Sequence, residues 1–183
     1  HFNGPAKVLH HIAHASYIRQ EDVARFAPLG VVADLCPMIW YPTTFLEGHK
    51  EAMGEERATR FWPIADLQKT GALLAGGSDW PVIPVPDPLT GIEGMVTRQN
   101  PSGAFPGVSL WAEQAIDLAT AIRIFTLNSA IAMGISQETG SIEPGKSADI
   151  IVLDQNVFDV PANRIAATKV VTTYFEGRAV YRR

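Results

Sequence analysis

The stretch ALLAGGSDWP at residues 72–81 decides the fold, because it joins a short apolar run to a polar turn rich in glycine. Residues 72–75 are wholly apolar, which is typical of a strand that is covered on both faces of a parallel sheet. The glycines and polar residues that follow predict a turn, and this turn carries Asp79.

Two similar apolar runs precede this strand. Residues 31–36 (VVADLC) are closed by a proline, and residues 7–12 form an earlier run. Helix-forming sequence separates the runs at residues 20–26 and 55–69. Strands that alternate with helices at this spacing predict an α/β fold of about three parallel βα units.

The second half of the chain changes in character. Residues 82–110 hold five prolines and predict a long irregular segment. Residues 118–133 predict a helix, with apolar residues at helical spacing. After it, residues 140–154 and 168–182 are rich in strand formers, and we expect them to form one small sheet separate from the parallel strands. A tight turn is expected at Gly177.

Two polar residues stand where the predicted strands end. His14 follows the first strand and Asp79 the third, and the carboxyl ends of parallel barrel strands face the reaction site. Imidazole and carboxylate groups both suit zinc-like ions. A structural histidine and a turn or capping aspartate are the alternatives. His10 and His11 point to opposite faces of a strand and cannot share one site, so we expect both to be structural.

Other residues are candidates for smaller roles. We expect Trp40, Tyr41 and Trp80 to line a substrate pocket, the alternative being that they only cover the mouth of the barrel. Arg98 is expected to bind substrate or to pair with an acidic group near the site, with a surface position as the alternative. Cys36, the only thiol, is a weak ligand, a nucleophile or an inert buried side chain.

Several short motifs resemble the amidohydrolase superfamily, and within it the branch of N-substituted formamide deformylases and exoenzyme regulatory proteins. The resemblance extends over residues 7–181. The motifs are HIAH at 11–14, CP at 36–37, GSDWPV at 77–82, TLNSA at 126–130, GSIEPGK at 140–146 and ADIIVLD at 148–154.

This resemblance implies a fold and a chemistry. The family has a (β/α)₈ barrel with a small β-sandwich, so residues 1–135 are expected to supply barrel strands six to eight and residues 136–183 part of the sandwich. His14 is then a ligand of a divalent metal, and zinc is expected, with one or two ions in the complete protein. Asp79 contacts the metal and acts as the base. The implied reaction is hydrolysis of a non-peptide C–N bond, of the N-acyl or N-formyl amide type, by metal-activated water.

The sequence also departs from the family pattern. Ala13 replaces an acidic residue, and Cys36 and Met38 stand where relatives usually carry glutamine and histidine. The other metal ligands of the family lie upstream of what this chain contains. A regulatory member that retains the fold without catalysis is therefore a second hypothesis. A generic parallel α/β binding domain is a third, although it does not explain residues 140–154.

Composition excludes several classes of protein. The 183 residues carry 15 basic and 19 acidic side chains, for a net charge of −4, and no basic cluster indicates nucleic-acid binding. No run of eighteen apolar residues predicts a membrane span, and a single cysteine excludes an internal disulfide. The cytoplasm is the default location.

The chain begins at His1 rather than methionine, which fits a mature product, a cleaved piece or a truncated chain, and the resemblance implies a C-terminal fragment. Its expected partners are a small-molecule amide and either the missing N-terminal part of the barrel or another copy of the chain. Three parallel strands leave open edges, and two recognisable ligands are fewer than the three of a typical catalytic zinc site. We therefore expect the isolated chain to be oligomeric or prone to aggregation, to hold metal weakly and to be inactive.

Overall fold

The computed structural model describes residues 8–39, 41–83 and 86–183. Its first sheet contains β1 (His10–His14), β2 (Val31–Leu35) and β3 (Leu74–Gly76), all parallel and in the order β1-β2-β3. The prediction of an α/β fold with three parallel strands in this region is confirmed. Apolar runs form these strands because the central strand must bury side chains on both faces.

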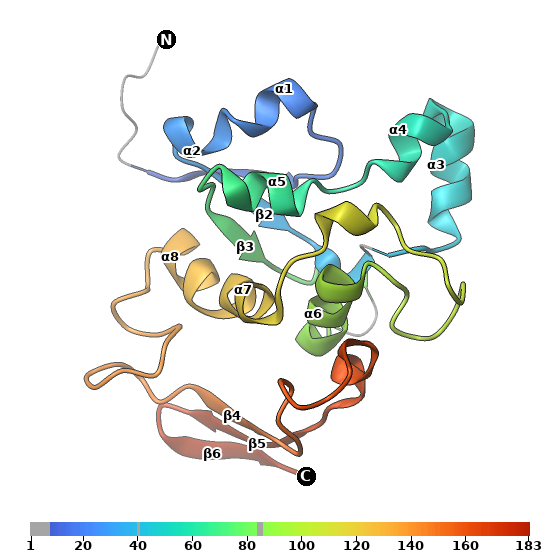
Figure 1. The fold of residues 1–183 in the computed structure, drawn as a ribbon. Coiled ribbons are helices and arrows are strands. Elements are labelled where there is room, and N and C mark those ends of the chain that lie inside the picture. The colour runs from blue at the N-terminus through green and yellow to red at the C-terminus, as the bar shows by residue number, and fades with distance from the viewer. Residues whose placement is uncertain (1–7, 40, 84–85) are drawn as a thin grey trace.

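Short helices pack on one face of the parallel sheet (Figure 1). They are α1 (Gln20–Val23), α2 (Phe26–Leu29) and α5 (Ile64–Lys69). Apolar side chains of these helices meet those of β2 and β3 in one buried core, which includes Val23, Phe26, Ala33, Leu35, Ile64, Leu67 and Leu74. Burial of this apolar surface is the main force that holds the layers together.

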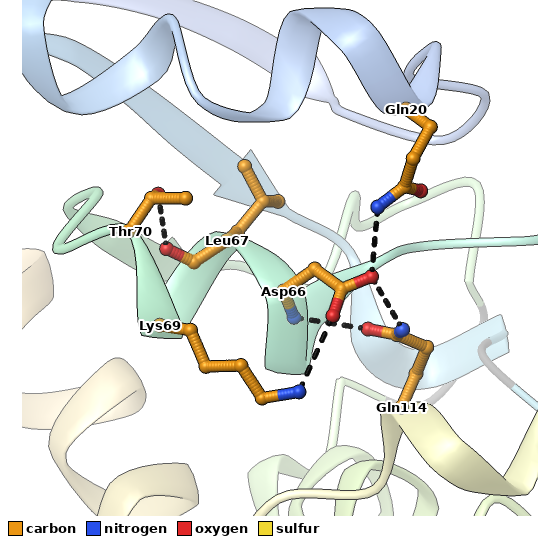
Figure 2. A network of polar contacts seen from close by, with 6 residues as sticks. All are labelled: Gln20, Asp66, Leu67, Lys69, Thr70 and Gln114. Carbon is orange, nitrogen blue, oxygen red and sulfur yellow. Dashed lines mark hydrogen bonds and ion pairs between the residues drawn. The ribbon is translucent and has the colours of Figure 1, made fainter.

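A polar network connects α1 and α5 with a neighbouring 3-10 helix (Figure 2). The Asp66 carboxylate on α5 accepts hydrogen bonds from Gln20 Nε2 (3.1 Å) and Gln114 Nε2 (2.9 Å), and Lys69 Nζ lies 3.4 Å from it. The Asp66 N–H donates in return to Gln114 Oε1 at 3.1 Å. Gln114 belongs to the 3-10 helix η2 (Ala112–Gln114) and is buried, so this exchange satisfies an amide that would otherwise be costly to bury.

Two predicted segments differ from the structure. The helix expected over residues 55–69 is interrupted, with α4 (Glu55–Thr59) and α5 separated where Trp62 has a φ of 56°. The irregular segment expected over residues 82–110 contains α6 (Pro88–Thr97). Its N-cap Asp87 accepts a hydrogen bond from the Leu89 N–H at 3.0 Å. A proline in the first turn lacks only an N–H that has no helical partner, so it can begin a helix as well as break one.

The loop that follows β2 is also more ordered than its prolines suggest. It contains the 3-10 helix η1 (Pro37–Ile39), and α3 (Phe45–Met53) begins soon after. Gly54 separates α3 from α4 with a φ of 84°, a conformation that glycine adopts without steric cost.

The helix predicted over residues 118–133 is confirmed as one continuous helical segment with a wider turn inside it. It consists of α7 (Leu118–Arg123), the π-helical turn η3 (Ile124–Asn128) and α8 (Ser129–Ala132). Asp117 caps its start by accepting a hydrogen bond from the Thr120 N–H at 2.9 Å. Within the described ranges, no helix is long and apolar enough to cross a bilayer.

The C-terminal region forms a second sheet, as predicted. It contains β4 (Ile150–Leu153), β5 (Val170–Phe175) and β6 (Arg178–Arg182), which are antiparallel and in that order. Figure 1 shows α6, α7 and α8 between this sheet and the parallel strands.

One buried contact attaches the C-terminal region to the helical layer. Glu93 on α6 accepts a hydrogen bond at 2.7 Å from the N–H of Ala166, in the 3-10 helix η4 (Ala162–Ala167). Burial raises the pKa of this carboxyl group, and the hydrogen bond partly offsets that effect.

Candidate metal centre

The register of the parallel sheet brings three strand ends together. Leu35, the last residue of β2, pairs with His14 on one side and with Gly76 on the other. Cys36 is the next residue after Leu35, and Asp79 lies three residues beyond Gly76. Neighbouring parallel strands place their carboxyl ends at the same edge of a sheet. Three side chains that can bind metal therefore emerge side by side.

Their donor atoms lie close together. His14 Nε2 is 3.9 Å from Asp79 Oδ2, and one donor atom each from His14, Cys36 and Asp79 lies within 4.8 Å of the other two. The side chains of His14 and Asp79 are 47% and 36% exposed, whereas Cys36 is only 5% exposed. The two residues predicted as ligands from the sequence do meet, and Cys36, for which a weak ligand was one of three alternatives, meets them.

The backbone around the cluster is held in an unusual conformation. His14 and Asp79 have φ values of 62° and 59°, in the left-handed region that side chains other than glycine rarely adopt. Such residues cost roughly 1–3 kcal/mol each and persist where the surroundings hold them. Trp62 Nε1 donates a hydrogen bond to the His14 carbonyl at 2.9 Å, and the Gly77 N–H donates to the Leu35 carbonyl at 2.9 Å. These contacts fix both strand ends.

Among the described residues, no lysine or arginine pairs with the acidic groups of the cluster. Burial, together with the nearby charges of Asp79 and Asp34, raises the pKa of the Cys36 thiol to about 11. Asp34 lies 3.4 Å from His11 Nδ1, and no ion pair joins Asp34 or Asp79 to a lysine or arginine in the described ranges. The negative charge and the mixed nitrogen, sulfur and oxygen donors suit a divalent metal, and all three donors are ligands of zinc.

Two hollows flank this cluster. Asp79 lines a cavity of about 270 Å³ together with Tyr41, His49 and Phe61, among other mostly apolar residues. His14 instead lines a wider groove of about 580 Å³ beneath α1 and α2. The polar atoms of His14 and Asp79 therefore lie close together, but the two residues line different hollows rather than the single cavity expected for them.

The aromatic residues predicted to bind substrate do not all lie at the Asp79 cavity. Tyr41 lines the Asp79 cavity, and its hydroxyl donates a hydrogen bond to the Met38 carbonyl at 2.5 Å. Trp80 is 65% exposed and is not among the residues that line this cavity. Trp40 lies outside the described residues.

Arg98 is buried behind the cavity wall and holds part of that wall by hydrogen bonds. It is fully buried, with Nε donating to the Leu110 carbonyl and Nη2 to the Phe61 carbonyl, each at 2.8 Å. These partners differ from the acidic or surface environments expected from the sequence, and full burial keeps the guanidinium from touching a substrate. Burial lowers its pKa to about 9. Because Leu110 and Phe61 line the Asp79 cavity, Arg98 holds part of its wall in place.

The sequence did not predict an aromatic cluster that lies beside the cavity. Tyr17 Oη and His49 Nδ1 lie 3.0 Å apart, and the His49 ring stacks on Phe61 with the centroids 5.0 Å apart. These residues come from the loop after β1, from α3 and from the segment before α5, so no local pattern links them. The position of Cys36 at the end of a predicted strand was the one sequence feature that placed it near the other strand ends.

Comparisons with known proteins agree on one family. A family model described as "Amidohydrolase family" matches residues 3–181. The protein LONG AFTER FAR-RED 3 of Arabidopsis thaliana is 29% identical over 98% of this chain, and an N-substituted formamide deformylase of Arthrobacter pascens is 30% identical over 68%. This chain spans only 30% and 22% of the lengths of these two relatives.

Solved structures show the same likeness. The crystal structure of an uncharacterized metal-dependent hydrolase from Pyrococcus horikoshii matches 83% of this chain with a TM-score of 0.66 and 28% identity, and this chain covers 30% of that one. The described residues therefore share the fold of about a third of that longer chain.

Proposed function

We propose that this chain, which belongs to the amidohydrolase family, is part of a metal-dependent hydrolase that cleaves a C–N bond other than a peptide bond. The observation that carries the proposal is the convergence of His14 and Asp79 at neighbouring strand ends, 3.9 Å apart. The deformylase relative supports a substrate of the N-formyl or N-acyl amide type.

The donor chemistry favours zinc. Histidine nitrogen and aspartate oxygen are common zinc ligands, and His14 and Asp79 would hold the ion, one or two ions being present in the complete protein. When bound, a divalent cation lowers the pKa of neighbouring water and polarises a carbonyl group.

Asp79 has the position of the catalytic base. Its carboxylate is partly exposed and lines the apolar cavity, so it can contact both a water molecule beside His14 and a substrate. Asp79 accepts a proton from the attacking water and then donates it to the leaving nitrogen. Tyr41 and the aromatic wall of the cavity would exclude water around the scissile bond.

The complete barrel would require additional strands. Every residue of β1 is exposed, although β2 beside it is largely buried. The exposed edge of β1 is where a preceding barrel strand would pair, supplied by the rest of a longer protein or by another copy of the chain. Residues 1–135 would then form strands six to eight of a (β/α)₈ barrel, and residues 136–183 part of a β-sandwich.

The test compares two products of one gene: the 183-residue chain and the protein encoded by the whole reading frame. Both are incubated with zinc and a panel of N-formyl and N-acyl amides. We expect turnover by the longer protein, loss of at least roughly a hundredfold in Asp79→Asn, and no turnover by the short chain. The variant His11→Gln disrupts the neighbouring histidine–aspartate pair and should retain activity.

Two results would contradict this proposal. One is a long protein that is folded and loaded with zinc but inactive on the whole panel, as the hypothesis of a regulatory, non-catalytic member predicts. The other is full activity in Asp79→Asn.

A further inference from the structure

The third member of the cluster is a cysteine at the end of the central strand. β2 lies between β1 and β3, so Cys36 emerges between the strand ends that carry His14 and Asp79. Its sulfur lies within 4.8 Å of a donor atom of each. We propose that Cys36 is a thiolate ligand of the metal, which makes the site a nitrogen, sulfur and oxygen centre.

The surroundings of Cys36 argue against its other roles. A nucleophilic cysteine needs nearby positive charge to stabilise its thiolate, but a carboxylate oxygen of Asp79 lies within 4.8 Å of this sulfur. A disulfide within the chain is impossible because no second cysteine exists. An inert core thiol would be enclosed by apolar groups, whereas this one adjoins a partly exposed histidine and aspartate. A bound cation is the partner that favours all three donors at once.

A sulfur ligand has a consequence for metal preference. Thiolates are soft donors that select zinc and similar ions, while carboxylate and water ligands suit magnesium, calcium and manganese. A coordinating thiol is also deprotonated outright by the metal. The chain should therefore prefer zinc or cadmium to manganese, and Cys36 should be the source of that preference.

Cobalt(II) titration of the 183-residue chain tests this inference without a catalytic assay. Cobalt bound to a thiolate has an intense charge-transfer absorption in the near ultraviolet. Because the chain has one cysteine, such a band can arise only from Cys36. Because the isolated chain is expected to hold metal weakly, we expect the band to saturate only with cobalt in excess of the chain and to disappear when zinc displaces cobalt. Cys36→Ser should lack the band. It should also bind zinc at least about tenfold more weakly, since even the loss of a residue that only orients a metal ligand costs about 10–100-fold in metal affinity.

His11→Gln is the matched control. Like His14, His11 belongs to β1 and lies beside an aspartate, but it is not part of the cluster. It should leave both the band and the zinc affinity unchanged. Circular dichroism verifies that each variant is folded. If Cys36→Ser does not fold, the spectrum of the unmodified chain decides the question by itself.

The inference is overturned if cobalt saturates the chain without a charge-transfer band, if the chain binds no cobalt, or if folded Cys36→Ser binds zinc as tightly as the unmodified chain. This inference rests on the proposed function only in placing the metal at the same strand ends, so the two can fail separately. A band without hydrolysis by the long protein contradicts the function, and hydrolysis without a band contradicts the sulfur ligand.

Discussion

The two sheets of this molecule have three strands each but differ in what covers them. In the parallel sheet, β2 is largely buried and β3 begins with buried residues, while β1 is exposed along its whole length. In the antiparallel sheet, β6 is fully exposed and residues of β4 and β5 are at most half-buried. A strand with both faces covered holds its end in one place, and Cys36 lies at such an end, while His14 and Asp79 lie at or just after the ends of the strands on either side. The antiparallel sheet has no comparable cluster in the described residues.

The junction between the two sheets should be the most sensitive position. Gly140 has a φ of 94°, and a Cβ placed there would lie 2.5 Å from the Ala130 Cβ and 3.2 Å from the Leu127 Cα. Gly140→Ala should reduce the free energy of unfolding by about 2–4 kcal/mol, from the backbone conformation and the overpacking together. Denaturant titration measures this change.

Gly145→Ala is its matched control. Gly145 has a φ of 92°, but a Cβ there meets nothing within 4 Å. Only the cost of the left-handed backbone conformation remains, so we expect the free energy of unfolding to fall by about 1 kcal/mol. Equal losses in the two variants would show that the added methyl group at residue 140 is accommodated beside α8 without overpacking.

A pair of valines compares the sheets directly. Val32 on β2 is fully buried, and Val180 on β6 is 59% exposed. Val32→Ala should cost about 2–3 kcal/mol, because two methyl groups leave the core and a cavity remains. Val180→Ala should change the free energy of unfolding by less than about 0.5 kcal/mol. A similar loss from Val180→Ala would mean that β6 is covered in solution by another surface.

The smallest expected effect concerns the start of α7, in the layer between the sheets. Hydrogen bonds from the Thr120 side chain and N–H hold the pKa of Asp117 below its usual value. Asp117→Ala should therefore cost about 1 kcal/mol at neutral pH. A lowered folded pKa contributes stability above the unfolded pKa, near 4, and that contribution disappears as the pH falls through the folded value.

Asp117→Asn separates the cap from the charge. Asparagine retains an acceptor oxygen but does not titrate, so the difference between the wild-type chain and this variant should shrink between pH 6 and about pH 3. Urea unfolding at both pH values measures it. A difference that is independent of pH would exclude the Asp117 charge as its cause.

Much of the fold followed from local patterns. The mostly apolar runs at residues 31–36 and 72–75 predicted β2 and β3, because strands that are covered on both faces are rich in apolar residues. Helices were harder to predict in the segment rich in proline, because proline usually ends a helix. Pro88 instead begins α6, since Asp87 caps the helix and a first-turn proline has no N–H to satisfy.

The sequence by itself determined the alternation of strand and helix, the C-terminal sheet, and the strand-end positions of His14 and Asp79. Tertiary structure decided which atoms meet. Cys36 joins His14 and Asp79 because Leu35 pairs with both neighbouring strands, and register is set by packing across the sheet. Arg98 became a buried support rather than a substrate contact because its partners, the Phe61 and Leu110 carbonyls, belong to separate segments. Contacts between distant segments leave no local periodicity, so no sequence pattern could predict them.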